Sequence, residues 1–183
     1  EEAVILHPNP TFGANLGVSL AVGDIDGDGM ADVVAGSNED VAISGPSTSM
    51  ADDAGAAYVF RGPLAGPTAE VLTTPSGPQN FQRFGSALLI ADLNSDGYDD
   101  IAAAAPGSAG GGMPFAGNVY VYFGGPTSSL NDSFRQLHLK SDTPSVYGLF
   151  GMSMAAGDFA GVGVNDLICA EPLAAGSGGP GSG

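Results

Sequence analysis

Short apolar runs alternate along the chain with turns that are rich in Gly, Pro and Asp. Representative runs occupy residues 18–22, 33–36, 87–90 and 101–104. Runs of this length, bounded by such turn residues, are typical of buried β-strands and are too short for ordinary helices. The hydrophobic pattern therefore predicts an all-β protein.

The pattern also repeats along the chain. Residues 16–24, 84–92 and 150–158 align, each segment ends on an aspartate, and these aspartates are 68 and then 66 residues apart. Internal repeats indicate one supersecondary unit per period, stacked on its neighbours. We therefore expect the fold to be built from similar modules.

Each module has the content of a four-stranded sheet. A second run follows the aspartate-rich loop and ends in a turn of small residues, at 35–37, 104–106 and 170–172. The first two units continue with a third and a fourth run, separated by a Gly-Pro turn, at 57–60 and 69–72 and at 119–123 and 134–139. Four antiparallel strands per unit predict blades of a β-propeller, in which radial repetition protects the sheet edges.

The units predict two complete blades, at 12–75 and 76–142. Residues 1–11 are expected to form the outer strand of a neighbouring or ring-closing blade. Residues 143–183 are expected to form an incomplete third blade with a Gly/Ser-rich end. Such a set does not close a ring, since propellers need about four to eight blades. Either the chain is a fragment of a longer propeller, which we favour, or it exchanges strands with further copies of itself.

The charge of the chain excludes some classes of partner. Its 183 residues include 20 acidic and 4 basic side chains, a formal charge of -16. Phosphate contacts need Lys and Arg, so we expect no nucleic-acid binding. No run of about 18 apolar residues is present, so we expect no membrane insertion. The single Cys169 lies in an apolar run and is expected to be a small core residue.

The loops between the first and second strands carry side-chain oxygens at positions 1, 3, 5 and 9. In two copies these residues are Asp24, Asp26, Asp28 and Asp32, then Asp92, Asn94, Asp96 and Asp100. Ca²⁺ takes about six to eight oxygen ligands, which alternate residues of a coiled loop can aim at one point. We expect the position-7 backbone carbonyls, those of Met30 and Tyr98, to join them. The sequence therefore predicts two calcium sites.

The loops begin like an EF-hand but lack its other features. An EF-hand has a bidentate Glu at position 12 and a helix on each side. Position 12 is Ala35 in the first loop and Ala103 in the second, and both flanks are predicted strands. We expect each loop to connect a hairpin that its position-9 aspartate closes. A plain Asp/Gly-rich turn without an ion is the alternative.

The third loop keeps only part of the pattern. Asp158 and Asp166 remain at positions 1 and 9, whereas Ala160 and Val162 offer no side-chain oxygen at positions 3 and 5. With two ligands missing, we expect no tight calcium site there. Asp158 or Asp166 is expected instead to cap backbone N–H groups and keep the turn.

Three elements of the units, in constant order, resemble the FG-GAP repeat. Phe84-Gly85 and Phe150-Gly151 open two units, the acidic loop follows, and a turn similar to Gly-Ala-Pro closes the second strand. The first unit departs from the pattern, with Leu16-Gly17 at its start and Ala-Gly-Ser at its turn. The resemblance extends from about residue 16 to residue 172. It implies the β-propeller of integrin alpha subunits and of many bacterial surface and secreted proteins.

The residues give little support for catalysis. The only histidines are His7 and His138, both on predicted outer strands, and no nucleophile–base set or zinc-ligand spacing is visible. We therefore expect a non-enzymatic, calcium-stabilised module that is extracellular, secreted or on the cell surface. Its expected role is adhesion, protein–protein interaction or assembly of a surface or filament.

The alternative role is that of an accessory propeller domain in a larger secreted enzyme. The expected partner is another protein, or further copies of the chain that bind through open blade edges. Asn131, in the sequence Asn-Asp-Ser, is a candidate glycosylation site.

Overall fold

The computed structural model describes residues 6, 8, 15–39, 42–43, 50–63, 69–126, 130 and 136–174. Over these residues the protein is all-β, with antiparallel sheets and no helix. Among them, therefore, no helical segment is long and apolar enough to cross a membrane. The predicted fold class is confirmed.

Two four-stranded sheets follow one another along the chain. The first has the order β1-β2-β5-β6, with bounds Leu20–Gly23, Asp32–Ser37, Ala56–Phe60 and Glu70–Leu72. The second has the order β7-β8-β9-β10, with bounds Leu88–Ala91, Asp100–Ala105, Asn118–Tyr122 and Gln136–Leu139. Every neighbouring pair is antiparallel, as in propeller blades.

A third, two-stranded sheet joins β11 (Met154–Gly157) to β12 (Asp166–Cys169). In all three sheets the acidic loop connects the first strand to the second. The register places Gly23 opposite Asp32, Ala91 opposite Asp100 and Gly157 opposite Asp166. Each acidic loop is thus the connection of a tight hairpin, as the sequence predicted.

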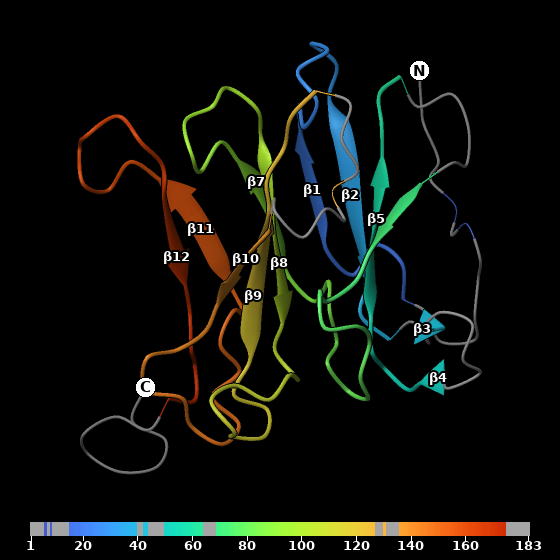
Figure 1. Cartoon of the computed structure of the whole chain (residues 1–183), viewed down its shortest axis with the longest axis vertical. Coiled ribbons are helices and arrows are strands. Elements are labelled where there is room, and N and C mark those ends of the chain that lie inside the picture. The colour runs from blue at the N-terminus through green and yellow to red at the C-terminus, as the bar shows by residue number, and fades with distance from the viewer. Residues whose placement is uncertain are drawn as a thin grey trace.

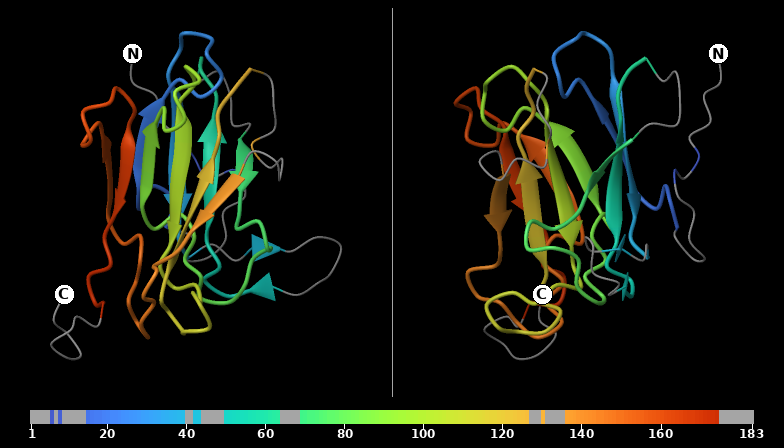
Figure 2. Two further views of the ribbon diagram at one scale, coloured as in Figure 1. Left: turned by 60° about the vertical axis from the view of Figure 1, so that its left-hand side comes forward. Right: turned by 45° about the vertical axis from the view of Figure 1, so that its right-hand side comes forward.

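The sheets stand side by side, with their first strands next to one another. In Figure 1, β7 lies between β1 and β11, and it contacts both of these strands. The three acidic loops project from the same end of the sheets in Figure 1 and in both views of Figure 2. The repeat thus brings chemically similar loops to one side of the molecule.

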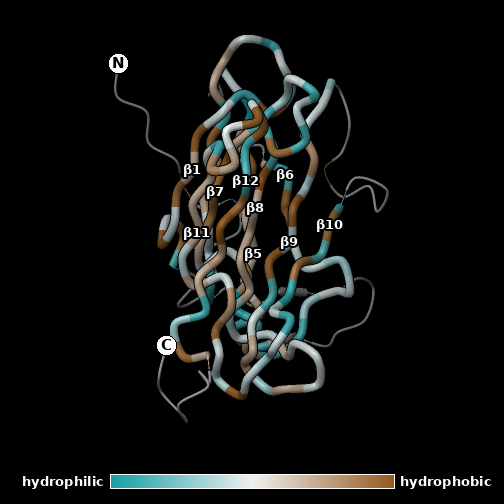
Figure 3. The backbone as a smooth tube through the Cα atoms, turned by 90° about the vertical axis from the view of Figure 1, so that its left-hand side faces the viewer, coloured by the Kyte–Doolittle hydropathy of each residue, from teal (hydrophilic) through white to brown (hydrophobic). Residues whose placement is uncertain are grey.

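The hydrophobic core consists of layers between the sheets. One cluster, which includes Val34, Val59, Phe84, Ile101 and Tyr122, fills the space between the first and second sheets. Another lies between the second and third sheets, and Figure 3 shows the hydrophobic stretches along the strands that form these layers. Because the second sheet packs between two others, its middle strands β8 and β9 are buried throughout. The strand β5 of the first sheet is also buried, since Ala56, Tyr58 and Phe60 form a further cluster on its other face.

The Phe-Gly segment of each later unit docks on the blade before it. The backbone N–H of Phe84 donates to Ala54 O at 2.9 Å, and that of Phe150 donates to Ala116 O at 2.7 Å. Gly55 allows this approach, since a Cβ there would lie 2.2 Å from Phe84 O. The repeat motif therefore serves as the joint between consecutive blades.

Two features differ from or fall outside the sequence prediction. The long connection after β2 contains a small hairpin of β3 (Ala42–Ile43) and β4 (Met50–Ala51) that the hydrophobic pattern did not predict, because two-residue strands leave no periodicity. Of the predicted outer strand at 1–11, the structure describes only Leu6 and Pro8, and neither is in a strand.

Candidate functional site

The first acidic loop gathers three carboxylates. Asp24, Asp26 and Asp28 each present an oxygen, and these oxygens lie within 4.8 Å of one another. They come from alternate residues of the turn between β1 and β2, as the sequence predicted. Gly27 and Gly29, with φ of +75° and +84°, give the loop the left-handed backbone that its tight coil requires.

Backbone N–H groups hold these carboxylates in place. Asp24 accepts hydrogen bonds from Gly27 N at 2.8 Å and from Gly29 N at 2.9 Å. Asp28 Oδ1 accepts one from Met30 N at 2.8 Å. Such bonds coil the loop around its acidic side chains, so the carboxylates converge even though they repel one another.

Asp32, at position 9, has a different environment from the cluster. Its side chain is buried, and its Oδ2 accepts a hydrogen bond from Ile25 N at 3.0 Å. Its Oδ1 accepts one from Gly62 N, at 2.8 Å, just beyond the end of β5. Asp32 therefore connects the two ends of the loop and also links the loop to the residue that follows the third strand of the sheet.

The second loop repeats this arrangement with one amide. Asp92 Oδ2 accepts from Gly97 N at 3.0 Å, and Asn94 Nδ2 donates to Asp96 Oδ2 at 3.0 Å. The buried Asp100 accepts from Leu93 N and from Gly124 N, both at 2.9 Å.

Burial raises the pKa of the Asp100 carboxyl, although its bonds to Gly124 and Leu93 act in the opposite direction. Desolvation opposes the charged form, whereas the two N–H donors favour it. The bonds are therefore needed to keep a carboxylate at this buried position.

The third loop forms without acids at positions 3 and 5. Asp158 Oδ2 accepts from Gly163 N at 2.8 Å, and Asp166 Oδ2 accepts from Phe159 N and Ala160 N, both at 3.0 Å. The N–H groups of Gly163 and Val162 lower the pKa of Asp158 because they stabilise its charged form. The expected capping role of these two aspartates is confirmed.

A common frame is thus present in all three loops. The position-1 aspartate accepts from the position-6 glycine at 2.8–3.0 Å, and the position-9 aspartate accepts from the N–H of position 2 at 2.9–3.0 Å. Only the first two loops add oxygen-bearing side chains at positions 3 and 5. The frame shapes the turn, and these additional side chains set its ligand chemistry.

Neighbouring loops are also in contact. Asp24 N donates to Asp99 Oδ2 at 2.9 Å, and Asn165 Nδ2 donates to Asp92 O at 3.0 Å. In each case the position-8 side chain of one loop reaches position 1 of the loop before it. Neither Asp99 nor Asn165 was predicted from the sequence, because nothing local distinguishes them from solvated polar residues.

The donors of the first two loops fit a hard divalent cation. They are carboxylate and amide oxygens, with no sulfur or imidazole ligand, and this set favours Ca²⁺ or Mg²⁺ over softer metals. In the first loop three of these side chains converge from alternate positions, and in the second Asn94 contacts Asp96. The chemistry of these oxygen donors therefore agrees with the calcium ligands predicted from the sequence.

Within the part of the chain that the structure describes, no other group of three or more His, Cys, Asp or Glu side chains converges in this way. His138 stacks on the ring of Tyr120 with a centroid distance of 4.7 Å, and Cys169 packs against the core between the second and third sheets. Burial raises the pKa of the Cys169 thiol, as expected for a packed cysteine. Asn131, the glycosylation candidate, lies outside the described residues, as does His7.

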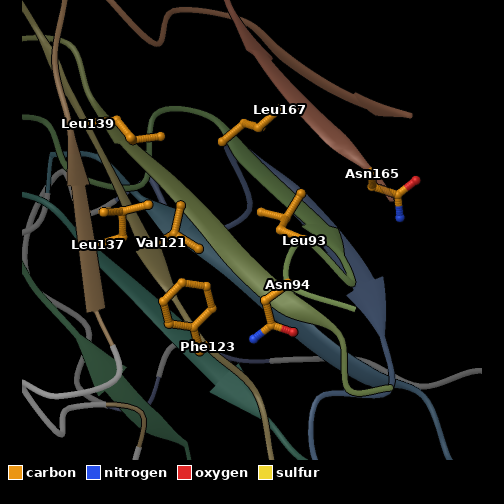
Figure 4. A pocket seen from close by; sticks show the side chains of 8 residues that line it. All are labelled: Leu93, Asn94, Val121, Phe123, Leu137, Leu139, Asn165 and Leu167. Carbon is orange, nitrogen blue, oxygen red and sulfur yellow. The ribbon is translucent and has the colours of Figure 1, made fainter. Parts of the chain in front are cut away.

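The described residues line a cavity near each end of the sheets. One of about 200 Å³ is apolar and opens beside the second loop, where Leu93, Val121, Leu137 and Leu167 point toward one another (Figure 4). The other, of about 540 Å³, lies at the opposite end of the blades, near the segments that precede β1, β7 and β11. Its lining includes Phe81, Arg83, Phe115, Leu149 and Met152.

Comparison with known families and proteins points to one kind of domain. The FG-GAP repeat model matches residues 84–122, which include the second acidic loop. The chain is 34% identical over 173 residues to integrin alpha-PS3 of Drosophila melanogaster, a match that covers 89% of the chain and 14% of that protein. It is 37% identical over 157 residues to integrin alpha-IIb of Mus musculus, covering 83% of the chain and 14% of the relative.

A relative of another kind matches equally well. Phosphatidylinositol-glycan-specific phospholipase D of Rattus norvegicus is 33% identical over 172 residues, covering 90% of the chain and 19% of that protein. The chain thus spans less than a fifth of the length of these relatives.

Proposed function

Because the chain is an FG-GAP domain of the integrin alpha-like kind, we propose that it is a calcium-stabilised, non-catalytic propeller module. It acts outside the cell, secreted or on the cell surface, in adhesion, protein–protein interaction or assembly. The grouping of Asp24, Asp26 and Asp28 within 4.8 Å is the observation that carries the calcium part of this proposal. Three carboxylates at this separation favour a cation among them, since their mutual repulsion is otherwise uncompensated.

Each of the first two loops would hold one Ca²⁺. The ligands of the first are Asp24, Asp26, Asp28, the backbone oxygen of Met30 and Asp32. Those of the second are Asp92, Asn94, Asp96, the backbone oxygen of Tyr98 and Asp100. Bound calcium would neutralise the carboxylates and pin each hairpin. The third loop, with Asp158 and Asp166 alone, would remain without a tightly bound ion.

Asp32 and Asp100 would have two roles in these sites. Each of their oxygens already accepts a backbone hydrogen bond, and a carboxylate has about four lone-pair sites in total. One remaining lone pair can complete the coordination. These two residues would thus connect the ion to the third strand of the blade.

The non-catalytic part of the proposal is supported by the surroundings of the histidine that the structure describes. His138 stacks on Tyr120, and burial together with Lys140 lowers its pKa. A general base needs a nucleophile within hydrogen-bond reach, and the ring of His138 is instead packed against an aromatic side chain. We therefore assign His138 to the packing of the second blade.

The partner would be a protein, or further copies of the chain that bind through open blade edges. The units proposed for such assembly are 12–75, 76–142 and 143–183, with 1–11 as the outer strand of a neighbouring blade. The native mass in solution separates the two cases. A mass of one chain at all concentrations would exclude copies of the chain as the partner.

The alternative proposal is an accessory propeller within a secreted enzyme. The 33% identity to phosphatidylinositol-glycan-specific phospholipase D favours it. In this case the propeller would still be non-catalytic, and the chemistry would belong to another part of the enzyme. An assay of the purified chain for phosphodiester cleavage tests this, and we expect no turnover above background.

Isothermal titration with Ca²⁺, together with thermal melting, tests the metal proposal. We expect two binding sites, a melting temperature that rises with free Ca²⁺, and one site in each of the variants Asp28→Ala and Asp96→Ala. The double variant should bind no calcium and melt at the same temperature with or without chelator. Absence of calcium binding by the folded wild-type chain would overturn the proposal.

A further inference from the structure

Arg61 contacts the first acidic loop from the end of β5. Its Nη1 lies 3.4 Å from Asp26 Oδ2 and 3.3 Å from Asp32 Oδ2, and its Nη2 lies 3.8 Å from Glu70 Oε2. The Arg61 side chain is 29% exposed. A fixed positive charge therefore contacts one of the three carboxylates of the cluster.

The second loop has no such charge at the equivalent position. Gly62 N donates to Asp32 in the first blade, and Gly124 N donates to Asp100 in the second, so these glycines occupy the same place. The residue before Gly124 is Phe123, which packs against the core between the second and third sheets. The two blades thus differ in charge at a position that touches the loop.

We propose that Arg61 acts as a tethered cation that competes with the divalent ion for Asp26. This inference rests on the proposed calcium function of the loops. Its consequence is that the first loop binds Ca²⁺ more weakly than the second, although it carries one more carboxylate. Occupancy of the first loop requires the Arg61 guanidinium to leave Asp26.

The physical reason is the position of the charge. A guanidinium within 3.4 Å of the Asp26 oxygen occupies a lone-pair direction that a bound metal ion would otherwise use. It also repels an incoming divalent cation at short range, where screening by salt is weak. Both effects oppose calcium binding at this loop, and among the described residues the ion pairs to loop carboxylates all come from Arg61 to the first loop.

Glu70 offers Arg61 a second place to bind. Glu70 Oε1 accepts a hydrogen bond from Leu130 N at 2.8 Å, which holds this carboxylate in position beside the guanidinium. If Asp26 binds Ca²⁺, Arg61 can remain paired with Glu70. The guanidinium would then shift between carboxylates without becoming solvent-exposed and unpaired.

The test measures each loop separately by calcium titration of the whole chain. Asp96→Ala leaves only the first loop able to bind, and Asp28→Ala leaves only the second. In the Asp96→Ala chain, Arg61→Gln should raise the Ca²⁺ affinity about tenfold, an effect of the size expected for one nearby charge. Arg61→Lys, which keeps the charge, should raise it much less.

The Asp28→Ala chain supplies the matched control. There Arg61→Gln should leave the affinity of the second loop unchanged, since Phe123 occupies the equivalent position. A further variant, Glu70→Gln in the Asp96→Ala chain, should lower the affinity of the first loop. Without the Glu70 carboxylate, the Arg61 guanidinium has one partner fewer and stays more firmly on Asp26.

The outcomes separate this inference from the proposed function. If Arg61→Gln leaves the calcium affinity of the first loop unchanged, the proposed role of Arg61 is wrong, whereas the proposed calcium sites are not affected. Absence of calcium binding in both folded chains would instead refute the first site itself. If Arg61→Gln does not fold, Glu70→Gln decides, because unchanged or increased affinity in that variant contradicts the competition.

Discussion

Asp24 and Asp99 join the first two acidic loops through two hydrogen bonds of opposite direction. Asp24 N donates to Asp99 Oδ2 at 2.9 Å, and Asp99 N donates to Asp24 O at 3.1 Å. Asp24 is also the residue that coils the first loop through Gly27 and Gly29. The contact between blades therefore acts on the residue that organises the first candidate metal site.

Loss of the Asp99 side chain should destabilise the protein and weaken the first site. Asp99→Ala leaves Asp24 N without its acceptor, at a cost of about 1–2 kcal/mol in the free energy of unfolding. Asp99→Asn keeps an acceptor oxygen and should cost less than half of this amount. Urea unfolding in chelator measures the first effect, and equal losses in both variants would show that charge, not the hydrogen bond, matters.

The substitutions Asp32→Ala and Asp28→Ala should change the melting temperature in different ways when Ca²⁺ is added. Asp32→Ala leaves the N–H groups of Ile25 and Gly62 without their acceptor in a buried place, at a cost of about 3 kcal/mol. We expect a melting temperature lower by about 8 °C in chelator, and a larger loss with Ca²⁺, because Asp32 is also one of the proposed ligands. Asp28→Ala should lower it only when Ca²⁺ is present. If Asp32→Ala is harmless in chelator, its hydrogen bonds do not stabilise the fold.

Gly27 should tolerate a side chain less well than Gly29. Both have positive φ, so alanine at either costs about 1 kcal/mol of backbone strain. A Cβ on Gly27 would also lie 2.5 Å from the Tyr98 ring, whereas one on Gly29 meets nothing within 4 Å. Gly27→Ala should therefore cost about 1–3 kcal/mol more than Gly29→Ala.

A double-mutant cycle with Tyr98→Ala isolates the steric part of this effect. Removal of the ring should recover most of the excess cost of Gly27→Ala and none of the cost of Gly29→Ala. Chemical unfolding in chelator keeps metal binding out of the comparison. An additive cycle at Gly27 would mean that Tyr98 moves away without strain.

The third loop should acquire calcium binding when its missing oxygens are restored. Val162 is 71% exposed and its N–H already donates to Asp158, so the frame has the required shape. The double substitution Ala160→Asp and Val162→Asp supplies the ligands at positions 3 and 5. Titration should then count one more site than in the wild type, while Ala160→Asn with Val162→Asn should bind more weakly.

His138 should make stability fall at mildly acidic pH. Burial and, to a lesser extent, Lys140 lower its folded-state pKa below the usual value of about 6.5. A lowered histidine pKa means that stability is fully present above about pH 6.5 and is lost as pH falls through the folded-state pKa. His138→Phe keeps the stacking on Tyr120 and removes the titration.

Unfolding free energies of wild type and His138→Phe, measured across this pH range, test the assignment. The wild type should lose more stability than the variant between neutral pH and pH of about 5.5. Carboxylates titrate in both proteins, so only the difference between the two curves reports on His138. Parallel curves would show that the imidazole titrates alike in the folded and unfolded chains.

Local features of the sequence were sufficient for the fold class and for the loops. The short apolar runs predicted β2 and β8, because strands depend on residues close together in the chain. The recurrence of the Asp24 loop at Asp92 predicted the register of the repeat, because each copy is recognisable from its own local motif. The missing oxygens at Ala160 and Val162 likewise distinguished the third loop from the others. These properties are encoded within segments of about ten residues.

Only the tertiary structure decided what surrounds these loops. The bonds from Gly62 and Gly124 to the position-9 aspartates, the contact of Asp99 with Asp24 and that of Arg61 with Asp26 join residues between 24 and 75 positions apart. Such pairs form when strands pair within a blade or when one blade packs on the next, and no local periodicity records them. The sequence by itself therefore determined which residues offer oxygen ligands, whereas the packing of the blades decided which charges and donors face them.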